Sequence, residues 1–363
     1  MVIHPRRCAL ALFAMLSSCL LDQEFKHKNP TTPAPLADGW AIAAPEDVGL
    51  SPAALSAIHD ELLRADRFVG ALAFLVVKDN RLVFETYLRD PADRDRPHHM
   101  QSTTKSVTSA LYGIARARGL MPGMDATLCS LMPDECVGLP AAKQGITLEH
   151  LLTMRSGLNV DNSDFSLEMW VDNPADPIRY LLDKPLYANP GERYYYRDAD
   201  PQLLGYALQR QLGQTEEAFA RTALFGPLGI TDYYWDHGAR GESMAAHGLF
   251  LEPRDLAKFG QLMLDGGAWL GEQVVPADWC VAATSHQVVP DDQPRFGYGY
   301  YFWIVPEAGG YSTWGHGGQY AFVVPRRRLV LVLVSHPDSD PTQLHGGMLG
   351  DFVDLTRPLW KDP

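Results

Sequence analysis

The sequence predicts an α+β fold in which strands from the two ends of the chain share one sheet. Apolar, β-favouring runs at residues 70–77 and 82–87 are separated by a short polar turn, which is typical of a hairpin. A second hairpin is predicted at residues 320–324 and 329–334. Between the hairpins, apolar residues recur with helical spacing. We therefore expect both ends of the chain to meet in one sheet, with a helical insertion between them.

The predicted helices begin and end at recognisable residues. Ser51 followed by Pro52 opens the first helix, because proline is favoured at the first helical position. Ser102 stands where an apolar-faced helix begins, and Gly119 stands where it ends. Further helices are expected at residues 147–157, 203–208, 252–264 and 343–355, and further strands at residues 297–305.

The composition is that of an ordinary globular protein. The 363-residue chain is 46% hydrophobic and 21% charged, and it is long enough to bury a substantial core. Its 44 acidic residues outnumber 31 basic ones and give a formal net charge of −13. Because a nucleic-acid partner requires a basic face, we expect no binding to nucleic acid.

The N-terminus has the features of a secretory signal. Two arginines precede an apolar run at residues 8–16, which is too short to span a bilayer as a helix. The run leads into Leu-Ser-Ser-Cys, which looks like a bacterial lipobox and implies cleavage before Cys19 and acylation of that cysteine. The alternative is an ordinary signal peptide that is cut nearby. The expected organisation is a signal peptide at residues 1–18, a polar, proline-bearing tether at 19–39 and a folded domain at 40–363.

A lipid on Cys19 would place the protein in the bacterial cell envelope. We expect an exported, membrane-anchored lipoprotein that faces the periplasm or the cell surface, which are oxidising compartments. Cys129 and Cys136 are close enough in sequence to form a disulfide, and an odd thiol would then remain. Sequence separation does not define the geometry of the Cβ atoms, so the sequence leaves this disulfide open.

The sequence contains no set of residues at metal-ligand spacing. His98 and His99 are adjacent, but neither a third histidine nor a carboxylate follows at ligand spacing. We interpret these two histidines as surface or loop residues. We accordingly expect neither a metal ion nor an organic cofactor.

Ser102 and Lys105 form a Ser-x-x-Lys pair at the start of the predicted helix. Residues three apart share one helix face, so the lysine amine can lie beside the serine hydroxyl. A serine hydroxyl is a weak nucleophile near neutral pH and needs a neighbouring group that takes its proton. The alternative interpretation is a Ser/Thr-rich helix start followed by one solvated lysine. Lys105 differs from every other lysine in the chain because it alone has a serine three residues before it.

Three consecutive tyrosines follow the Pro-Gly turn at residues 190–191. A tyrosine at a turn ahead of a helix can act as a general base if nearby cations stabilise its phenolate. At least two of the three must be packing residues, because one site has room for one base. These candidates are Tyr194, Tyr195 and Tyr196.

Three motifs occur in a fixed order along the chain: Ser-Thr-Thr-Lys at 102–105, Tyr-Arg-Asp at 196–198 and His-Gly-Gly at 316–318. With these motifs the chain resembles the serine β-lactamase and penicillin-binding-protein superfamily, in particular its class C-like branch of esterases, peptidases and amide hydrolases. The resemblance extends from about residue 40 to the C-terminus. It implies a β-lactamase/transpeptidase-like fold, with an antiparallel sheet, helices on both of its faces and a mostly helical inserted subdomain.

The resemblance also implies a role for each motif residue. Ser102 would be the acylated nucleophile, Lys105 its proton partner and Tyr196 the base that reprotonates the leaving group. The backbone N–H groups of Ser102 and Gln319 would form the oxyanion hole. Gly317 and Gly318 would let the strand edge lie close to the substrate.

Two positions depart from the pattern of the β-lactamases. His316 replaces the lysine of Lys-Thr-Gly, and Asp198 replaces the asparagine of Tyr-x-Asn. A neutral imidazole beside a carboxylate would hold an anionic drug poorly. The Tyr-Arg-Asp variant, with the loop from Trp170 to Pro185, looks more like the 6-aminohexanoate-oligomer hydrolases and carboxylesterases of this branch.

We therefore expect a serine hydrolase that cleaves a small-molecule ester or amide through an acyl-enzyme. One alternative is β-lactamase or D-Ala-D-Ala carboxypeptidase activity on peptidoglycan-like substrates. An alternative of another class is a non-catalytic binding protein with the same fold. The presence of serine, lysine and tyrosine together favours the enzyme, because an inert fold has no need of all three.

Overall fold

The structure, a computed structural model, describes residues 32–64, 68–160, 162, 176–238, 240–336 and 348–361. The predicted signal peptide, Cys19 and Trp170 lie outside the described residues. No helix in the described ranges has the length and apolar run needed to cross a bilayer.

Eight strands form the main sheet, in the order β1-β3-β2-β13-β12-β11-β10-β9. The N-terminal hairpin β2-β3 and the C-terminal hairpin β12-β13 are both present, and β2 pairs with β13 in antiparallel register. The two ends of the chain therefore meet in one sheet, as the sequence predicts. The strands are β1 Ala41–Ile42, β2 Ala71–Lys78, β3 Arg81–Tyr87, β9 Gly297–Tyr298, β10 Trp303–Val305, β11 Gly310–Ser312, β12 Tyr320–Val324 and β13 Leu329–Ser335.

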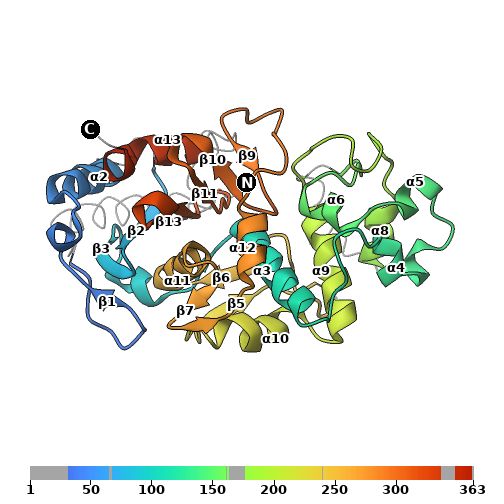
Figure 1. Ribbon diagram of the computed structural model, residues 1–363, viewed down its shortest axis with the longest axis horizontal. Helices are drawn as coiled ribbons and strands as arrows, with labels where there is room; N and C mark the ends of the chain where they lie inside the picture. The colour runs from blue at the N-terminus through green and yellow to red at the C-terminus, as the bar shows by residue number, and fades with distance from the viewer. Residues whose placement is uncertain are drawn as a thin grey trace, which may run out of the picture.

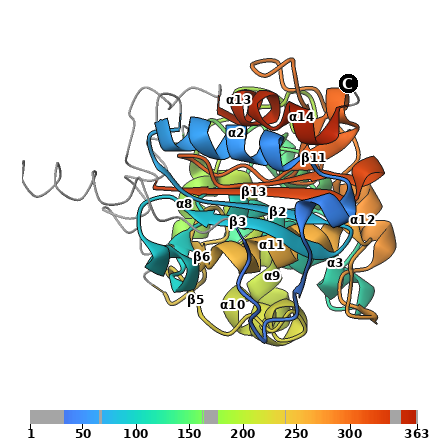
Figure 2. The same ribbon diagram turned by 90° about the vertical axis from the view of Figure 1, so that its left-hand side faces the viewer.

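Helices cover both faces of this sheet (Figure 2). On one face lie α2 (Pro52–Arg64), α13 (Met348–Leu355) and α14 (Arg357–Trp360). On the other face, α11 (Pro253–Leu264) packs against β2, β12 and β13. A Cβ atom on Gly260 would lie 2.7 Å from Val330 Cγ1, so only glycine allows α11 to approach β13 this closely.

The middle of the chain forms a helical subdomain beside the sheet, drawn in green on the right of Figure 1. A disulfide joins Cys129 and Cys136 in this subdomain, while Cys280 is buried and free. The predicted helix at 147–157 ends early, because Met154 has a φ of 57°, which no helical residue adopts. The subdomain helices are α4 Leu128–Leu131, α5 Ala141–Gln144, α6 Leu148–Leu152, α8 Pro177–Asp183 and α9 Ala199–Leu212.

Helix α3 (Thr103–Ala117) lies between the sheet and the helical subdomain (Figure 1). A small sheet of β4 (His98–His99), β6 (Leu249–Leu251) and β5 (Tyr233–Trp235) stands just ahead of it. The interpretation of His98 and His99 as surface or loop residues is wrong, because both are half-buried and paired with β6.

The remaining short elements connect these layers. They are α10 Glu216–Ala220, α12 Ala277–Ala283, the hairpin of β7 Ala268–Trp269 and β8 Glu272–Gln273, the π-turn Arg221–Phe225, and the 3-10 turns Pro45–Val48, Pro91–Asp95, Asp134–Cys136, Pro306–Ala308 and Pro325–Arg327.

Candidate active site

Ser102 sits on a strained turn immediately before α3. The preceding residue, Gln101, has a φ of 50°, which is uncommon for any residue other than glycine. The turn is held on both sides, because the Met100 N–H donates to Leu249 O at 2.8 Å and the Lys105 N–H donates to Ser102 O at 3.1 Å. Strain of this kind persists where the surroundings fix the backbone, and it is common at reactive residues.

Lys105 points from the first turn of α3 into a buried cluster. Its side chain is 1% exposed. Its Nζ donates to Ser102 Oγ and to Ala246 O, each at 2.8 Å, and lies 2.6 Å from Asp198 Oδ1. Two of these contacts are hydrogen bonds, and the contact with Asp198 is an ion pair at close range.

The charge of Lys105 follows from two opposing effects. Burial lowers the pKa of the amine, but the Asp198 carboxylate and the Tyr196 oxygen raise it, and the net pKa lies above the ordinary value. Lys105 is therefore an ammonium in the resting site, and it donates to Ser102 rather than accepting from it.

Tyr196 is the member of the tyrosine run that faces this cluster. Lys105 Nζ lies 5.2 Å from the centre of its ring, and the ring packs 5.6 Å from Trp303. Burial raises the pKa of Tyr196, although Lys105 and a hydrogen bond with Ser102 act against this rise. By contrast, Tyr194 is buried against Tyr298, and Tyr195 is 43% exposed.

Buried Arg197 packs against the rings of Tyr187 and Tyr195. Its guanidinium carbon lies 4.8 Å from the ring centre of Tyr187 and 5.0 Å from that of Tyr195, and its Nη2 donates to Tyr187 Oη at 3.0 Å. The ring of Tyr196, the residue before Arg197, lies on the side of Lys105.

Asp198 pairs with Lys105 and not with His316. The sequence predicts an imidazole beside a carboxylate, but His316 is exposed and makes no ion pair with any described residue. The expectation that these two departures from the β-lactamase pattern act as one pair is therefore wrong.

The segment at residues 313–319 lies across from the Ser102 turn. Thr103 Oγ1 bonds to Thr313 Oγ1 at 3.1 Å and donates to Gln319 O at 2.9 Å. The Gln319 N–H donates to Gly315 O at 3.1 Å, so this expected oxyanion donor is already occupied. The buried Gln319 side chain in turn bonds to the backbone of Ser335.

Other backbone donors beside the nucleophile are free. The N–H groups of Ser102, His316 and Gly317 make no hydrogen bond within the described ranges. Gly317 and Gly318 have φ values of 79° and 106°, a backbone conformation that requires glycine at the second position and strongly favours it at the first. The His-Gly-Gly turn follows Gly315, which packs against the backbone of Met100, so these free donors lie near the Ser102 turn.

Sequence reasoning missed several groups around the cluster. Ala246 O accepts from Lys105, and His247 is buried next to it with a pKa lowered to about 4 by burial, so this histidine is neutral. A ring nitrogen of His99 bonds to His247 O, and Gln101 Nε2 lies 3.0 Å from His99 Nδ1. No local pattern marks these residues, because they meet only through the pairing of β4 with β6.

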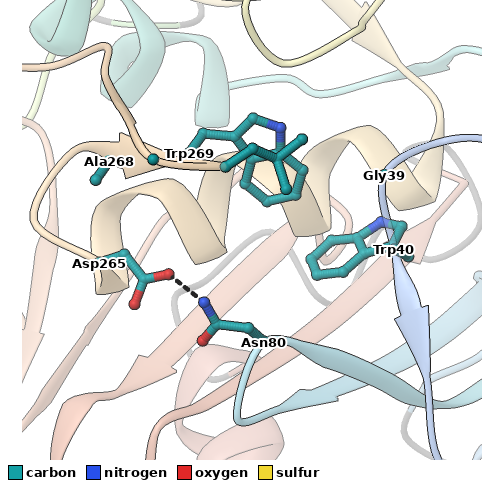
Figure 3. A pocket seen from close by; sticks show the side chains of 8 residues that line it. Gly39, Trp40, Asn80, Asp265, Ala268 and Trp269 are labelled. Carbon is teal, nitrogen blue, oxygen red and sulfur yellow. Dashed lines mark hydrogen bonds between the residues drawn. The ribbon is translucent and has the colours of Figure 1, made fainter.

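Two further features lie apart from the cluster. Across the described part of the chain, no group of histidine, cysteine or acidic residues is arranged to hold a metal ion. A surface pocket of about 230 Å³ opens between Trp40 and Trp269, beside the hydrogen-bonded pair Asn80 and Asp265 (Figure 3). No residue of the Ser102 cluster lines this pocket.

The family model for beta-lactamases matches residues 58–346 of this chain. The chain belongs to the beta-lactamase family. Among curated relatives of this beta-lactamase-family chain, the 6-aminohexanoate-dimer hydrolase of Paenarthrobacter ureafaciens is 28% identical over 313 residues, which cover 79% of this chain and 78% of that protein. The esterase EstB of Burkholderia gladioli is 27% identical over 213 residues, which cover 51% of this chain and 52% of that protein.

Solved structures of the family share the fold. EstCE1, a hydrolase with promiscuous acyltransferase activity, superposes with a TM-score of 0.68 at 15% identity, covering 84% of this chain and 97% of that chain. A class C beta-lactamase superposes with a TM-score of 0.64 at 14% identity, covering 85% and 95%. The predicted β-lactamase/transpeptidase-like fold is confirmed, and the relatives of this beta-lactamase-family protein include esterases and amide hydrolases.

Proposed function

We propose that the protein is a serine hydrolase that cleaves an ester or amide bond through an acyl-enzyme on Ser102. The observation that carries this proposal is the 2.8 Å contact between Lys105 Nζ and Ser102 Oγ in a buried site, with the Tyr196 ring centre 5.2 Å from the same amine. The nucleophile and the lysine that exchanges its proton are already within bonding distance before substrate arrives.

The reaction follows from this arrangement. Ser102 Oγ attacks the substrate carbonyl carbon while its proton passes into the cluster formed with Lys105 and Tyr196. The leaving group takes a proton through Tyr196, and water then releases the acyl group by the same path in reverse. No step requires a metal ion or an organic cofactor.

The developing oxyanion would be stabilised by the free N–H of Ser102 and a free N–H of the 316–317 turn. The Gln319 N–H is bound to Gly315 O, so we assign the second donor to His316 or Gly317 instead. Each such donor typically contributes about 3 kcal/mol to the stability of the transition state.

We further propose that neutral esters and amides are better substrates than penicillins or cephalosporins. Exposed His316 stands where a β-lactamase has a fixed cation, so an anionic drug would lose one charge-assisted hydrogen bond. Such a loss typically costs about 1.5 to 3 kcal/mol, or roughly ten- to hundredfold in kcat/KM.

The experiment compares kcat/KM for a p-nitrophenyl ester and a chromogenic cephalosporin at neutral pH. We expect the ester to be turned over faster, and Ser102→Ala to abolish both reactions. A cephalosporin rate above the ester rate would favour the β-lactamase alternative, and an inactive protein would favour the non-catalytic binding alternative.

We also propose that the protein is exported and held to a membrane by a lipid on Cys19. The Leu-Ser-Ser-Cys run after a short apolar segment supports this proposal. Labelling of the wild type with a fatty-acid probe, together with loss of the label in Cys19→Ser, is the expected result. Equal labelling of both would refute it.

A further inference from the structure

Asp198 adds a carboxylate to the active site, although a Ser-x-x-Lys pair does not require one. It stands at the N-cap of α9, a position where aspartate ordinarily accepts from the first N–H groups of the helix. Here its side chain makes no capping bond. Its Oδ1 instead lies 2.6 Å from Lys105 Nζ. The carboxylate therefore serves the active-site lysine and not its own helix.

The resting site leaves Ser102 without an evident base. Lys105 is an ammonium whose pKa is raised, and Tyr196 is a neutral phenol whose pKa is also raised. Neither group can take a proton from Ser102 until it has first lost its own. The Asp198 carboxylate lies 2.6 Å from the amine of Lys105.

The groups that face Asp198 come from several elements. Lys105 comes from α3, Tyr298 from β9 and His247 from the loop before β6. Tyr196 lies two residues before Asp198 in the same segment. Burial raises the pKa of both tyrosines and lowers that of His247 to about 4, so all three are uncharged near neutral pH. Lys105 is the charged group in direct contact with the carboxylate.

We propose that Asp198 is the final acceptor of the Ser102 proton and that Lys105 relays it. This proposal rests on the proposed hydrolase function. One N–H bond of Lys105 breaks as its proton forms an O–H bond with Asp198. The Ser102 proton moves to the lone pair left on Nζ, and Oγ forms its bond to the carbonyl carbon.

The proton count of this step is balanced without any further reactant. Lys105 is an ammonium before and after the transfer, Asp198 becomes a neutral acid, and the carbonyl π electrons move to the oxygen. When the intermediate collapses, the proton returns through Lys105 and Tyr196 to the leaving group. The two transfers cross contacts of 2.6 and 2.8 Å that exist in the resting site.

Asp198→Asn tests this assignment because it keeps the shape of the side chain but cannot take a proton. In the wild type the acceptor is the Asp198 carboxylate paired with Lys105, so we expect the acylation rate to stay level from pH 6 to pH 9. In the variant, burial lowers the pKa of Lys105 with no carboxylate to oppose it, and neutral Lys105 becomes the acceptor. The variant rate should then rise about tenfold per pH unit until the amine is neutral.

The measurement is the second-order rate constant for labelling of Ser102 by a fluorophosphonate, followed by intact mass between pH 5.5 and 9.5. We expect the variant to be at least about 30-fold slower than the wild type at pH 6 and within about threefold of it above pH 9. The matched control is Asp291→Asn, whose side chain is 79% exposed and lies 4.0 Å from Arg193. This control should keep the wild-type profile.

Each other outcome is decisive. If Asp198→Asn follows the wild-type profile, Asp198 is not the acceptor. If the wild-type rate itself rises tenfold per pH unit up to pH 9, a neutral lysine or a phenolate is the base and the proposal fails. This test uses the wild type alone, so it does not depend on whether the variant folds. If the wild type is never labelled on Ser102, the proposed hydrolase function fails instead.

Discussion

Two buried ion pairs in this protein each join a cation to a carboxylate, but they have different roles. Arg254 at the start of α11 is 3% exposed on its side chain, and it donates to both oxygens of Glu85, to Asp38 and to Ala34 O. Lys105 at the start of α3 is 1% exposed and faces a carboxylate, a carbonyl and a serine hydroxyl. Both cations are buried against a carboxylate and a backbone carbonyl, and both lie in the N-terminal turn of a helix.

The difference lies in what each cation can release. A guanidinium keeps its protons at any relevant pH, so Arg254 is a permanent tie between α11, β3 and the arm at residues 34–38. A lysine amine can pass a proton to a neighbour. Lys105 lies between Ser102, which can give a proton, and Asp198, which can take one. One pair therefore suits a structural role, while the other suits a chemical role.

Exchanging the two cations should separate these roles most strongly. Lys105→Arg keeps the charge but cannot release a proton, so we expect a loss of at least about 1,000-fold in kcat for a p-nitrophenyl ester. Arg254→Lys keeps the charge but loses the paired bonds to Glu85, so its activity per folded molecule should stay near that of the wild type. Substantial turnover by Lys105→Arg would show that this amine acts only as a charge.

The tyrosine run gives the next largest expected effect. Tyr196→Phe removes the hydroxyl that we propose passes a proton to the leaving group, and it should lower kcat about 100- to 1,000-fold. Tyr195→Phe is the matched control, because that side chain is 43% exposed and stacks near Tyr187. Loss of turnover in Tyr195→Phe with retention in Tyr196→Phe would mean that the wrong tyrosine has been assigned to proton transfer to the leaving group.

Breaking the ion pair of Arg254 with Glu85 should lower the free energy of unfolding and leave kcat unchanged. Glu85→Gln leaves Arg254 buried without its main counter-charge, which typically costs about 3 to 5 kcal/mol in the free energy of unfolding. Urea denaturation would measure this loss. An unchanged midpoint would contradict the structural role of the pair, and a specific loss of kcat in fully folded protein would contradict the separation of roles.

Glu216 supplies a buried carboxylate without any cation. It is fully buried, neither oxygen makes a hydrogen bond within the described residues, and the Thr108 hydroxyl that faces it donates to Ala245 O. Burial raises its pKa to about 7 from an ordinary value of 4.5. The folded state therefore holds this proton more tightly than the unfolded state, so stability is full below pH 4.5 and falls as pH rises toward 7.

Glu216→Gln should remove that pH dependence. Glutamine matches the shape of the protonated acid, so we expect little change in the free energy of unfolding at pH 4.5. At pH 8 we expect a gain of up to about 3 kcal/mol, the free energy that corresponds to the raised pKa. Thermal unfolding at the two pH values measures both figures. Equal effects at the two pH values would show that Glu216 does not titrate in the folded protein.

Local patterns predict much of this fold but less of the site. The hairpins β2-β3 and β12-β13 and the helix α3 follow from apolar periodicity and end signals, which are properties of short segments. The helix at 147–157 ends early because a left-handed residue at Met154 fits the tertiary structure and breaks the local pattern. The pairing of β2 with β13 is consistent with the prediction that both hairpins share one sheet.

The structure brings Ser102, Lys105 and Tyr196 together. The spacing of Ser102 and Lys105 predicts their contact, whereas the choice of Tyr196 among three tyrosines comes from the resemblance to the family. The partner of Asp198 could not be read from the sequence, because it depends on how α9 is placed against α3. Likewise, the occupied N–H of Gln319 and the bond from Lys105 to Ala246 O depend on backbone geometry in segments that are far apart in the chain.

The central claim is that Ser102 is a nucleophile activated by this cluster. Intact-mass analysis of the wild type and of Ser102→Ala after exposure to a fluorophosphonate tests it most directly. We expect one phosphonyl adduct on the wild type, located on Ser102 by peptide mapping, and none on the variant. A wild type that stays unmodified, or an adduct of equal yield on both proteins, would contradict the account.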